Sequence, residues 1–271
     1  MNDKKIPDQE LIISTIEIAK EAGKAISEIY NSDFDYQFKK DFSPITAADT
    51  LSHSIITERL KTITPEIPIL SEENCNIPYK IRSQWKQYWL VDPLDGTKEF
   101  INKNGEFTVN IALIDQNTPI FGIIHIPETS ETYWGSKFGG SFYSSDKHDV
   151  KQIRVSEIYQ NPILIVASRS HPSLELDSLL EKIKDYKIIN IGSSVKFCLV
   201  ASGKADFYPR FGPTSEWDVA AGEAIVKFAG GHIMTMDGKP MSYNLKEDYL
   251  NPSFMVSSNK IVPKKLLSLI E

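Results

Sequence analysis

The sequence predicts a layered protein of mixed helices and strands, of the α/β or α+β class. Apolar residues recur at every third or fourth position between Asp8 and Tyr30, which is the period of a helix. Between Gln87 and Ile126 the pattern changes to short apolar runs rich in branched and aromatic residues, which favour strands. Helices and strands in this order pack as layers around shared cores.

The first two elements are helices. The apolar positions of the helix predicted over 8–30 are Ile12, Ile16, Ala19, Ala22, Ile26 and Ile29. A second helix is predicted to begin after Ser43-Pro44, with Leu51, Ile55 and Leu60 on its apolar side.

Three strands are predicted next. They cover Tyr88–Val91, Phe107–Ile114 and Ile120–Ile126, separated by turn residues. Asn110 interrupts the second apolar run, and we interpret it as a minor break. A shorter apolar run, Ile67–Leu70, is a further candidate strand.

A polar stretch suggests a domain boundary near residue 150. Gly139-Gly140 and the segment Ser144–Asp149 form the most polar connection in the middle of the chain. We therefore expect an N-terminal α+β subdomain over 1–150 and a C-terminal α/β subdomain over 151–271. Within the second, the elements predicted are strands at Ile163–Ala167 and Lys187–Ile191, a helix at Leu174–Ile183, and a helix at Trp217–Phe228 ended by Gly230-Gly231.

Composition excludes several classes of protein. The 271 residues carry a net charge of -6, whereas a protein that coats a nucleic acid backbone needs many clustered cations. No run approaches the roughly 18 apolar residues of a membrane span, and the N-terminus, Met1–Lys5, lacks the apolar run of a signal peptide. We expect a cytoplasmic protein with no obligatory membrane partner, although peripheral association with the inner face of the cell membrane stays open. Cys75 and Cys198 are expected to be reduced.

The segment 92–97, Asp-Pro-Leu-Asp-Gly-Thr, is the first candidate for chemistry. It follows an apolar strand, and its Pro and Gly fix a tight turn that can present Asp92 and Asp95 on one side. Carboxylates, the Thr97 hydroxyl and the Leu94 carbonyl are oxygen ligands of the kind that Mg²⁺ prefers. The alternative is that Asp95-Gly96 is only a turn.

Three other acidic sites lie in comparable settings. Glu72 follows the apolar run Ile67–Leu70, although Glu72-Glu73 also fits a solvated acidic pair. Asp49 and Asp218 each stand three residues after a Thr or Ser at a predicted helix start. That spacing fits helix capping as well as a functional carboxylate.

Candidates for binding an anion lie in the second half. The segment Ile191–Lys196 offers amides, the Ser193 hydroxyl and a cation, but also fits an ordinary loop that enters a helix. Arg210 can bind phosphate or cover apolar surface with its stem. His171 is a weaker candidate, since a lone histidine is more often structural.

In combination, these segments resemble a known family. Three of them resemble the lithium-sensitive, magnesium-dependent phosphatases of the inositol monophosphatase superfamily: Ser71–Glu73, Asp92–Thr97 and Glu216–Gly222. Three others look most like the bacterial 3'(2'),5'-bisphosphate nucleotidases of that superfamily: Ser43–Asp49, Gly192–Cys198 and Arg210–Asp218. The resemblance spans nearly the whole chain. It implies a layered α-β-α-β-α sandwich, similar to inositol monophosphatase and fructose bisphosphatase, with the site between two subdomains.

The resemblance also implies an activity and its metal ions. The expected reaction is hydrolysis of the nucleotide adenosine 3',5'-bisphosphate to AMP and phosphate, which is linked to sulfur assimilation. Two or three Mg²⁺ ions per site are implied. Glu72, Asp92 and the Leu94 carbonyl would hold one, and Asp92, Asp95 and Asp218 would hold another.

Further roles follow from the same resemblance. Asp49 and Thr97 would orient the attacking water, with Glu72 as a third catalytic residue. The amides of Gly96 and Thr97 would contact the scissile phosphate, beside Asp95 and Asp218. The rest of the nucleotide would be bound by Ser193, Lys196, Arg210 and His171.

Alternatives remain at this stage. An inositol monophosphatase or a sugar bisphosphatase would share the metal core, and a nucleotide-binding sensor would share the pocket without the chemistry. Aspartyl-phosphate enzymes place their two acids two residues apart, whereas Asp92 and Asp95 are three apart with Pro93 between them. The sequence does not indicate an oligomeric state.

Overall fold

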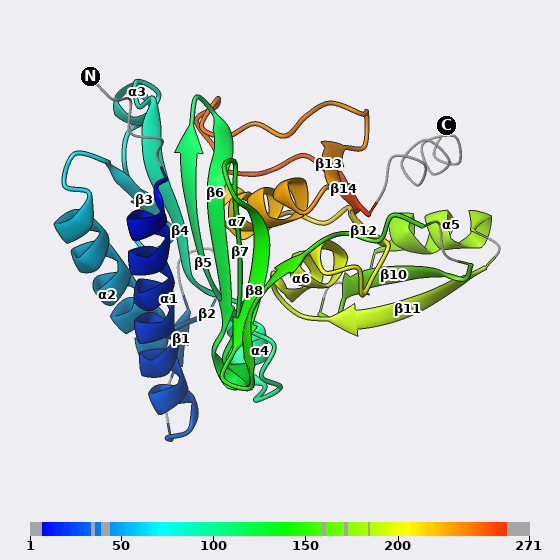
Figure 1. The fold of residues 1–271 in the computed structure, drawn as a ribbon, viewed down its shortest axis with the longest axis horizontal. Helices are drawn as coiled ribbons and strands as arrows, with labels where there is room; N and C mark the ends of the chain where they lie inside the picture. Colours follow the sequence, from blue (N-terminus) through cyan, green and yellow to red (C-terminus); the bar gives the residue numbers. More distant parts are fainter. Residues whose placement is uncertain are drawn as a thin grey trace.

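The chain folds into five layers. A computed structural model describes residues 7–33, 36–38, 44–158, 161–170, 173–183 and 185–258. In Figure 1, helices α1 (Gln9–Tyr30) and α2 (Ala47–Ile63) lie on one face of a seven-stranded sheet. Helices α6 (Val195–Ala201) and α7 (Glu216–Phe228) lie between that sheet and a five-stranded one, and α5 (Leu174–Lys182) packs against the second sheet. The predicted α-β-α-β-α sandwich is confirmed.

The large sheet has the order β3-β4-β5-β6-β7-β8-β9. Its strands are β3 (Ile69–Ser71), β4 (Gln87–Asp95), β5 (Thr108–Asp115), β6 (Thr118–Ile126), β7 (Glu131–Ser136), β8 (Gly140–Ser145) and β9 (His148–Ile153). Strands β3 and β4 are parallel, and every later neighbour is antiparallel. Consecutive strands are therefore joined mainly by short turns, as antiparallel pairs allow.

The second sheet has the order β11-β10-β12-β14-β13. Its strands are β10 (Ile163–Ser168), β11 (Tyr186–Ile191), β12 (Phe207–Arg210), β13 (His232–Thr235) and β14 (Phe254–Ser257). Short elements complete the described chain: β1 (Tyr36–Phe38), β2 (Pro44–Thr46), α3 (Tyr79–Arg82), α4 (Thr97–Ile101) and the 3-10 helix η1 (Pro127–Thr129).

Most predicted elements lie where the sequence pattern places them. The helix predicted over 8–30 is α1, capped by Asp8, whose side chain accepts a hydrogen bond from the Leu11 amide at 2.9 Å. The three predicted strands correspond to β4, β5 and β6, and the helix predicted over 217–228 is α7. Cys75 and Cys198 are free thiols.

The prediction for Leu51 is wrong. This side chain is exposed, whereas Ile56 and Leu60 of the same helix are fully buried. The buried stripe of α2 also includes Asp49 and Ser52, so it is partly polar. Because the buried face of α2 includes polar residues, the positions of its apolar residues alone predict the wrong face.

The polar segment near residue 145 is a hairpin turn. It joins β8 to β9, and β9 pairs with β8 along the edge of the large sheet. A boundary at residue 150 would therefore fall inside a strand. Hairpin turns and interdomain linkers are rich in the same polar residues, which explains why the sequence suggested a domain boundary here. We propose that the passage between the two layers lies after Ile153 and before Ile163, where the second sheet begins.

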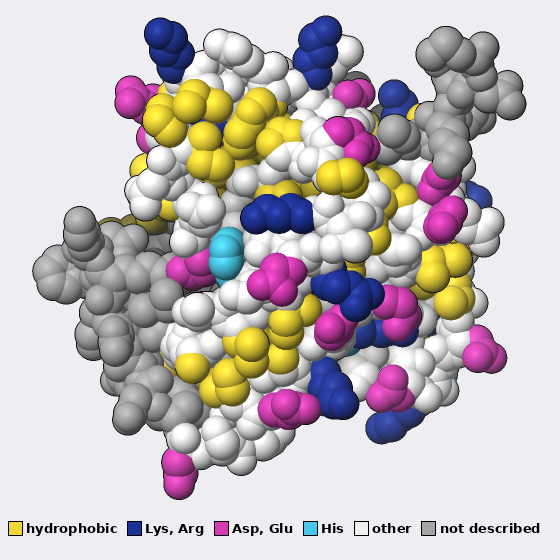
Figure 2. Space-filling model, turned by 90° about the vertical axis from the view of Figure 1, so that its left-hand side faces the viewer, with side chains coloured by type: hydrophobic (Ala, Val, Ile, Leu, Met, Phe, Trp, Pro, Cys, Tyr) yellow, Lys and Arg dark blue, Asp and Glu magenta, His cyan; other side chains and the backbone are white. Residues whose placement is uncertain are grey.

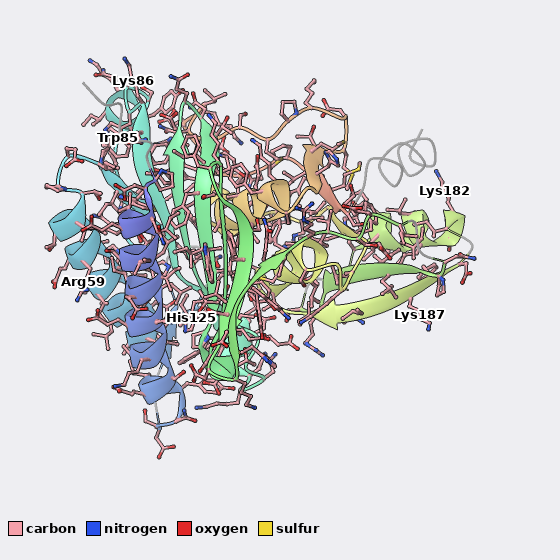
Figure 3. All side chains as sticks on the ribbon, viewed as in Figure 1. Arg59, Trp85, Lys86, His125, Lys182 and Lys187 are labelled. Carbon is pink, nitrogen blue, oxygen red and sulfur yellow. The ribbon has the colours of Figure 1, made fainter. Side chains whose placement is uncertain are left out.

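The outer helices present a mixed surface. Figure 2 looks onto the side of α1 and α2, where cationic and anionic side chains are interspersed rather than gathered by sign. Arg59 of α2 pairs with Glu21 of α1 at 3.1 Å, and Figure 3 shows Arg59 on this outer face. Lys182 and Lys187 lie on α5 and β11, at the opposite side of the molecule (Figure 3). In the described part of the chain, no helix has the length and hydropathy of a membrane span.

Helix α7 is seated on two glycines of the large sheet. Gly122 of β6 and Gly135 of β7 are paired across the two strands. A Cβ atom on Gly122 would lie 2.5 Å from the Ala221 carbonyl oxygen, and one on Gly135 would lie 2.8 Å from the Ile225 Cα atom. Only residues without a side chain let the helix backbone approach this closely. The position of α7, which carries Asp218 in its first turn, depends on this contact.

We predict that Gly122→Ala destabilises the protein by about 1–3 kcal/mol, because the added methyl group overpacks the contact with α7. Urea unfolding measures the change. Gly139→Ala is the matched control, since Gly139 is exposed in a turn, and it should change stability by less than about 0.5 kcal/mol. Equal stabilities for the two variants would contradict the proposed seat of α7.

A buried carboxyl on α7 predicts a pH dependence of stability. Glu223 accepts a hydrogen bond from the Tyr243 hydroxyl at 2.6 Å, and burial raises its pKa to about 7. The folded protein therefore binds more protons than the unfolded chain between about pH 4.5 and 7, so this group's contribution to stability falls as pH rises through that range. Glu223→Gln removes this titration. Its stability relative to the wild type should increase by up to about 3 kcal/mol between pH 5 and pH 8. Urea unfolding at both pH values tests this, and an unchanged difference would refute it.

Candidate active site

The site begins at a bulge in β4. Asp92 pairs with Asn110 of β5, and Asp95 pairs with Thr108, so three steps along β4 match two along β5. Residues two apart in a strand point to the same face, as Thr108 and Asn110 do. The extra residue in β4 therefore brings Asp92 and Asp95 to that same face, which regular alternation over three steps would prevent.

Local contacts fix this bulge. Pro93 has no N–H to donate, and its carbonyl accepts a hydrogen bond from the buried Ser52 hydroxyl of α2 at 2.7 Å. The Leu94 amide donates to Asp92 Oδ1 at 3.1 Å. The acidic segment is thus anchored to the helix behind the sheet.

The chain then turns at Gly96 into the short helix α4. Gly96 has a φ of 91°, in the left-handed region that favours glycine. Thr97 follows, and its hydroxyl lies 3.4 Å from Asp49 Oδ1. The other oxygen of Asp49, Oδ2, accepts hydrogen bonds from the amide and the hydroxyl of Thr46, each at 2.7 Å. Asp49 therefore caps α2 and meets Thr97 at the same time.

Helix α7 and strand β3 bring two more carboxylates. Asp218 lies in the first turn of α7, where its Oδ2 accepts from the Ser215 amide at 2.9 Å. Glu72 directly follows β3, and its amide donates to the Val91 carbonyl of β4 at 3.1 Å. One carboxylate oxygen each of Glu72, Asp92 and Asp218 lie within 4.8 Å of one another. These three oxygens can share one hard cation.

The electrostatics of this cluster favour a bound cation. Burial raises the pKa of Asp92 well above its ordinary value, and four neighbouring carboxylates raise it further: Glu72, Asp95, Asp218 and Asp49. Burial also raises the pKa of Asp218, followed by the charges of Asp95 and Glu72. A divalent cation offsets this repulsion, so the donor set fits Mg²⁺.

The turn before α6 faces the acidic segment. Gly96 and Ser193 nearly touch, since a Cβ on Gly96 would lie 3.1 Å from that of Ser193. Lys196, in the first turn of α6, is buried and donates to the carbonyls of Ile191 at 3.2 Å and Ser193 at 2.5 Å. Burial lowers its pKa to about 8, against the opposing charge of Asp95.

Two buried donors in this region have no hydrogen-bond partner among the described residues. They are the Ser193 hydroxyl and Arg210 Nε, whose residues both line the same pocket. Arg210 is fixed at its other end, where Nη2 donates to the Pro213 carbonyl at 3.0 Å. Because buried polar groups are almost always paired, unpaired donors beside a cavity indicate a place for an anionic ligand.

One pocket of about 240 Å³ connects the two halves of the site. Eight of the predicted site residues line it: Glu72, Asp95, Gly96, Thr97, Ser193, Lys196, Arg210 and Asp218. Asp49, Asp92 and Leu94 are buried beside it. His171 lies outside the described residues. The structure thus brings every described candidate to one place, although their roles stay predictions.

Sequence reasoning missed several polar residues of this region, among them Asn110, Glu99 and Ser194. Asn110, interpreted as a break in a strand, is buried and contacts Asp95 Oδ2 at 3.4 Å. Glu99 of α4 lines the pocket and accepts a hydrogen bond from Ser170 at 2.5 Å. An amide inside an otherwise apolar strand is the signal that could have identified Asn110, because such a group needs partners when buried.

Comparison with known proteins identifies relatives over almost the whole chain. The model of the inositol monophosphatase family matches residues 8–271. The chain is 47% identical to the 3'(2'),5'-bisphosphate nucleotidase CysQ of Salmonella typhimurium, over 89% of this chain and 97% of that protein.

Solved structures agree with this relationship. The crystal structure of CysQ from Bacteroides thetaiotaomicron, described as a bacterial member of the inositol monophosphatase family, superposes with a TM-score of 0.80 at 39% identity, covering 92% of this chain and 97% of that one. An IMPase/NADP phosphatase complexed with Mg²⁺ and phosphate shares the fold with a TM-score of 0.77 at 17% identity, covering 96% and 93%. The match of the family model over residues 8–271 and the 47% identity to a curated relative show that this chain belongs to the inositol monophosphatase family.

Proposed function

We propose that this chain is a magnesium-dependent 3'(2'),5'-bisphosphate nucleotidase that hydrolyses adenosine 3',5'-bisphosphate to AMP and phosphate. The observation that carries the proposal is a pocket lined both by the carboxylates of Glu72, Asp95 and Asp218 and by Lys196, Arg210 and donors that have no partner among the described residues. Such a pocket suits a substrate with two phosphates, one at the metal and one at the cations. The 47% identity to a nucleotidase over 89% of the chain supports the choice of substrate.

The carboxylates are proposed to hold two or three Mg²⁺ ions. Glu72, Asp92 and the Leu94 carbonyl would bind one, and Asp92, Asp95 and Asp218 would bind another. When bound, magnesium neutralises a phosphate dianion, acidifies a water molecule and stabilises the departing oxygen. The Mg²⁺ in the structure of the related IMPase/NADP phosphatase is consistent with this choice of ion.

Asp49 and Thr97 are proposed to orient the attacking water. Thr46 holds Asp49 Oδ2, which leaves Oδ1 facing the Thr97 hydroxyl at 3.4 Å. If that hydroxyl donates its proton to Asp49, its oxygen is left to accept a hydrogen bond from the water. Water aligned in this way attacks phosphorus directly, so no covalent enzyme intermediate is needed. Glu72 is proposed as a further catalytic carboxylate beside the metal.

The remaining residues are proposed to bind the substrate. The amides of Gly96 and Thr97 would contact the scissile phosphate, next to Asp95 and Asp218. Ser193, Lys196 and Arg210 would bind the other phosphate, since two of them carry the unpaired donors. His171 is retained as a candidate nucleotide contact.

A substrate panel tests the assignment. With Mg²⁺, purified protein should show kcat/KM for adenosine 3',5'-bisphosphate at least about 10-fold above that for inositol 1-phosphate, which lacks a second phosphate, and above that for fructose 1,6-bisphosphate, which has two phosphates but no nucleoside. Released phosphate is measured for all three. Preference for inositol 1-phosphate or fructose 1,6-bisphosphate would change the assignment to an inositol monophosphatase or a sugar bisphosphatase. Tight nucleotide binding without phosphate release would indicate a sensor.

We predict that Asp95→Asn lowers kcat/KM for the bisphosphate by at least about 100-fold, because a charged metal ligand is lost. The fold should persist, since Asn retains an oxygen that accepts from Ser194 and one of the mutually repelling charges is removed. Activity is titrated against Mg²⁺ and thermal unfolding is measured without metal. Asp115→Asn, at the far end of β5, is the control and should retain full activity. Near-normal turnover by Asp95→Asn at saturating Mg²⁺ would exclude the proposed role.

A further inference from the structure

A buried chain of hydrogen bonds ends on Asp95. The Thr108 hydroxyl donates to Asn110 Oδ1 at 2.9 Å, Asn110 Nδ2 donates to the Ser194 hydroxyl oxygen at 2.9 Å, and Ser194 donates to Asp95 Oδ2 at 2.6 Å. Thr108, Asn110 and Ser194 are each no more than 2% exposed. The chain starts on β5 of the large sheet and reaches the turn that precedes α6.

The direction of each bond follows from the number of hydrogens available. Because Ser194 donates its only hydrogen to Asp95, Asn110 must turn its amide nitrogen toward Ser194, which leaves Asn110 Oδ1 to accept from the Thr108 hydroxyl. Ser194 has one hydroxyl hydrogen and two acceptors, Asp95 Oδ2 and the Asp218 carbonyl at 2.9 Å. The hydrogen belongs to the shorter bond, since a carboxylate is the stronger acceptor. The Ser194 oxygen is then free to accept from Asn110.

All of these contacts act on one oxygen of Asp95. Thr108 at 3.5 Å, Asn110 at 3.4 Å and Ser194 at 2.6 Å approach Oδ2, and Oδ1 takes part in none of these bonds. The longer two add little, because hydrogen bonds weaken steeply with distance. Ser194 therefore restrains the rotation of the carboxylate, and Asn110 acts mainly through Ser194.

Asn110 has no evident role in the strand itself. Its neighbours Val109 and Ile111 are fully buried apolar residues, and asparagine is disfavoured in strands. A buried amide destabilises the fold unless its groups are paired, and here Thr108 and Ser194 pair them. The presence of Asn110 and Ser194 at these buried positions is explained by their contacts with Asp95, which lines the pocket.

We propose that Ser194 and Asn110 are positioning residues that orient the Asp95 carboxylate for metal binding. The proposal rests on the metal-dependent function above. Groups that orient a metal ligand from behind typically change metal affinity by 10–100-fold when removed. Ser194 Oγ also lies 2.9 Å from the backbone carbonyl oxygen of Asp218, so Ser194 is adjacent to two of the proposed ligand residues.

Binding of Mn²⁺ to protein without substrate tests the proposal, measured by electron paramagnetic resonance. Ser194→Ala should weaken Mn²⁺ binding by about 10-fold or more, since Asp95 loses its principal restraint. Ser141→Ala is the matched control, because Ser141 is also buried and its hydroxyl donates to the Ile225 carbonyl of α7 at 2.7 Å. The control should bind Mn²⁺ within about twofold of the wild type, with a similar loss of thermal stability in both variants. Ser194→Thr retains the hydroxyl and should recover most of the affinity.

A double variant separates this role from simple packing. If Asn110 acts through Ser194, then Asn110→Ala combined with Ser194→Ala should bind Mn²⁺ about as weakly as Ser194→Ala alone. Wild-type affinity in Ser194→Ala, or an equal loss in Ser141→Ala, would overturn the proposal. So would the absence of Mn²⁺ binding by the wild type. A wild type that binds Mn²⁺ but does not hydrolyse the bisphosphate would refute the nucleotidase assignment alone, and the positioning role would then be decided by the Mn²⁺ affinities.

Discussion

The mutual repulsion of closely spaced carboxylates is the constraint on which the site depends. Glu72, Asp92 and Asp218 place oxygens within 4.8 Å of one another, and burial followed by the charges of neighbouring acids raises the pKa of Asp92. Side chains under such repulsion would turn away from one another unless they are held. Hydrogen-bond donors hold them here: the Leu94 amide for Asp92, the Ser215 amide for Asp218, and Ser194 for Asp95. The protein therefore stabilises a charge arrangement that is complete only with a cation.

The distances between the carboxylates also depend on how the layers pack. The carboxylates come from β3, β4 and the start of α7, so their geometry depends on how α7 sits on the large sheet. Gly122 and Gly135 allow that close approach, and Gly96 allows the turn before α6 to approach the acidic segment. A methyl group at any of these positions would shift one part of the pocket relative to another. Glycines that are distant in sequence thus set distances within one pocket.

The sequence predicted the residues that gather in the pocket better than the residues that support them. Asp92 and Asp95 stand out because a strand ends beside them, and family resemblance adds Glu72 and Asp218 from distant segments. The bulge that brings Asp92 and Asp95 to one face was not predicted, since it depends on pairing with Thr108 and Asn110 of the next strand. A single asparagine in an apolar run carries no sign of which residue it will contact across the sheet.

The errors in the fold have a similar origin. Leu51 is apolar but exposed, because the buried stripe of α2 includes the polar residues Asp49 and Ser52. Both polar residues face the candidate site. The Thr97 hydroxyl contacts Asp49, and the Ser52 hydroxyl donates to the Pro93 carbonyl. Hydrophobic periodicity assumes that burial serves only the core. It fails where a helix also supports chemistry.

Helix capping does not exclude a place in the candidate site, because Asp49 and Asp218 have both. Asp49 and Asp218 each use Oδ2 to accept from a backbone amide at the start of a helix, at 2.7 Å and 2.9 Å. A carboxylate held in this way has one orientation before any ligand arrives, so little side-chain freedom is lost when its other oxygen is used. At Asp218, the hydrogen bond from the Ser215 amide also favours the charged form, which opposes the rise that burial causes in the pKa of Asp218. Capping therefore fixes the orientation of these carboxylates and leaves their second oxygen directed toward the site. The spacing that first suggested a purely structural role is part of the reason that these two residues can serve the site.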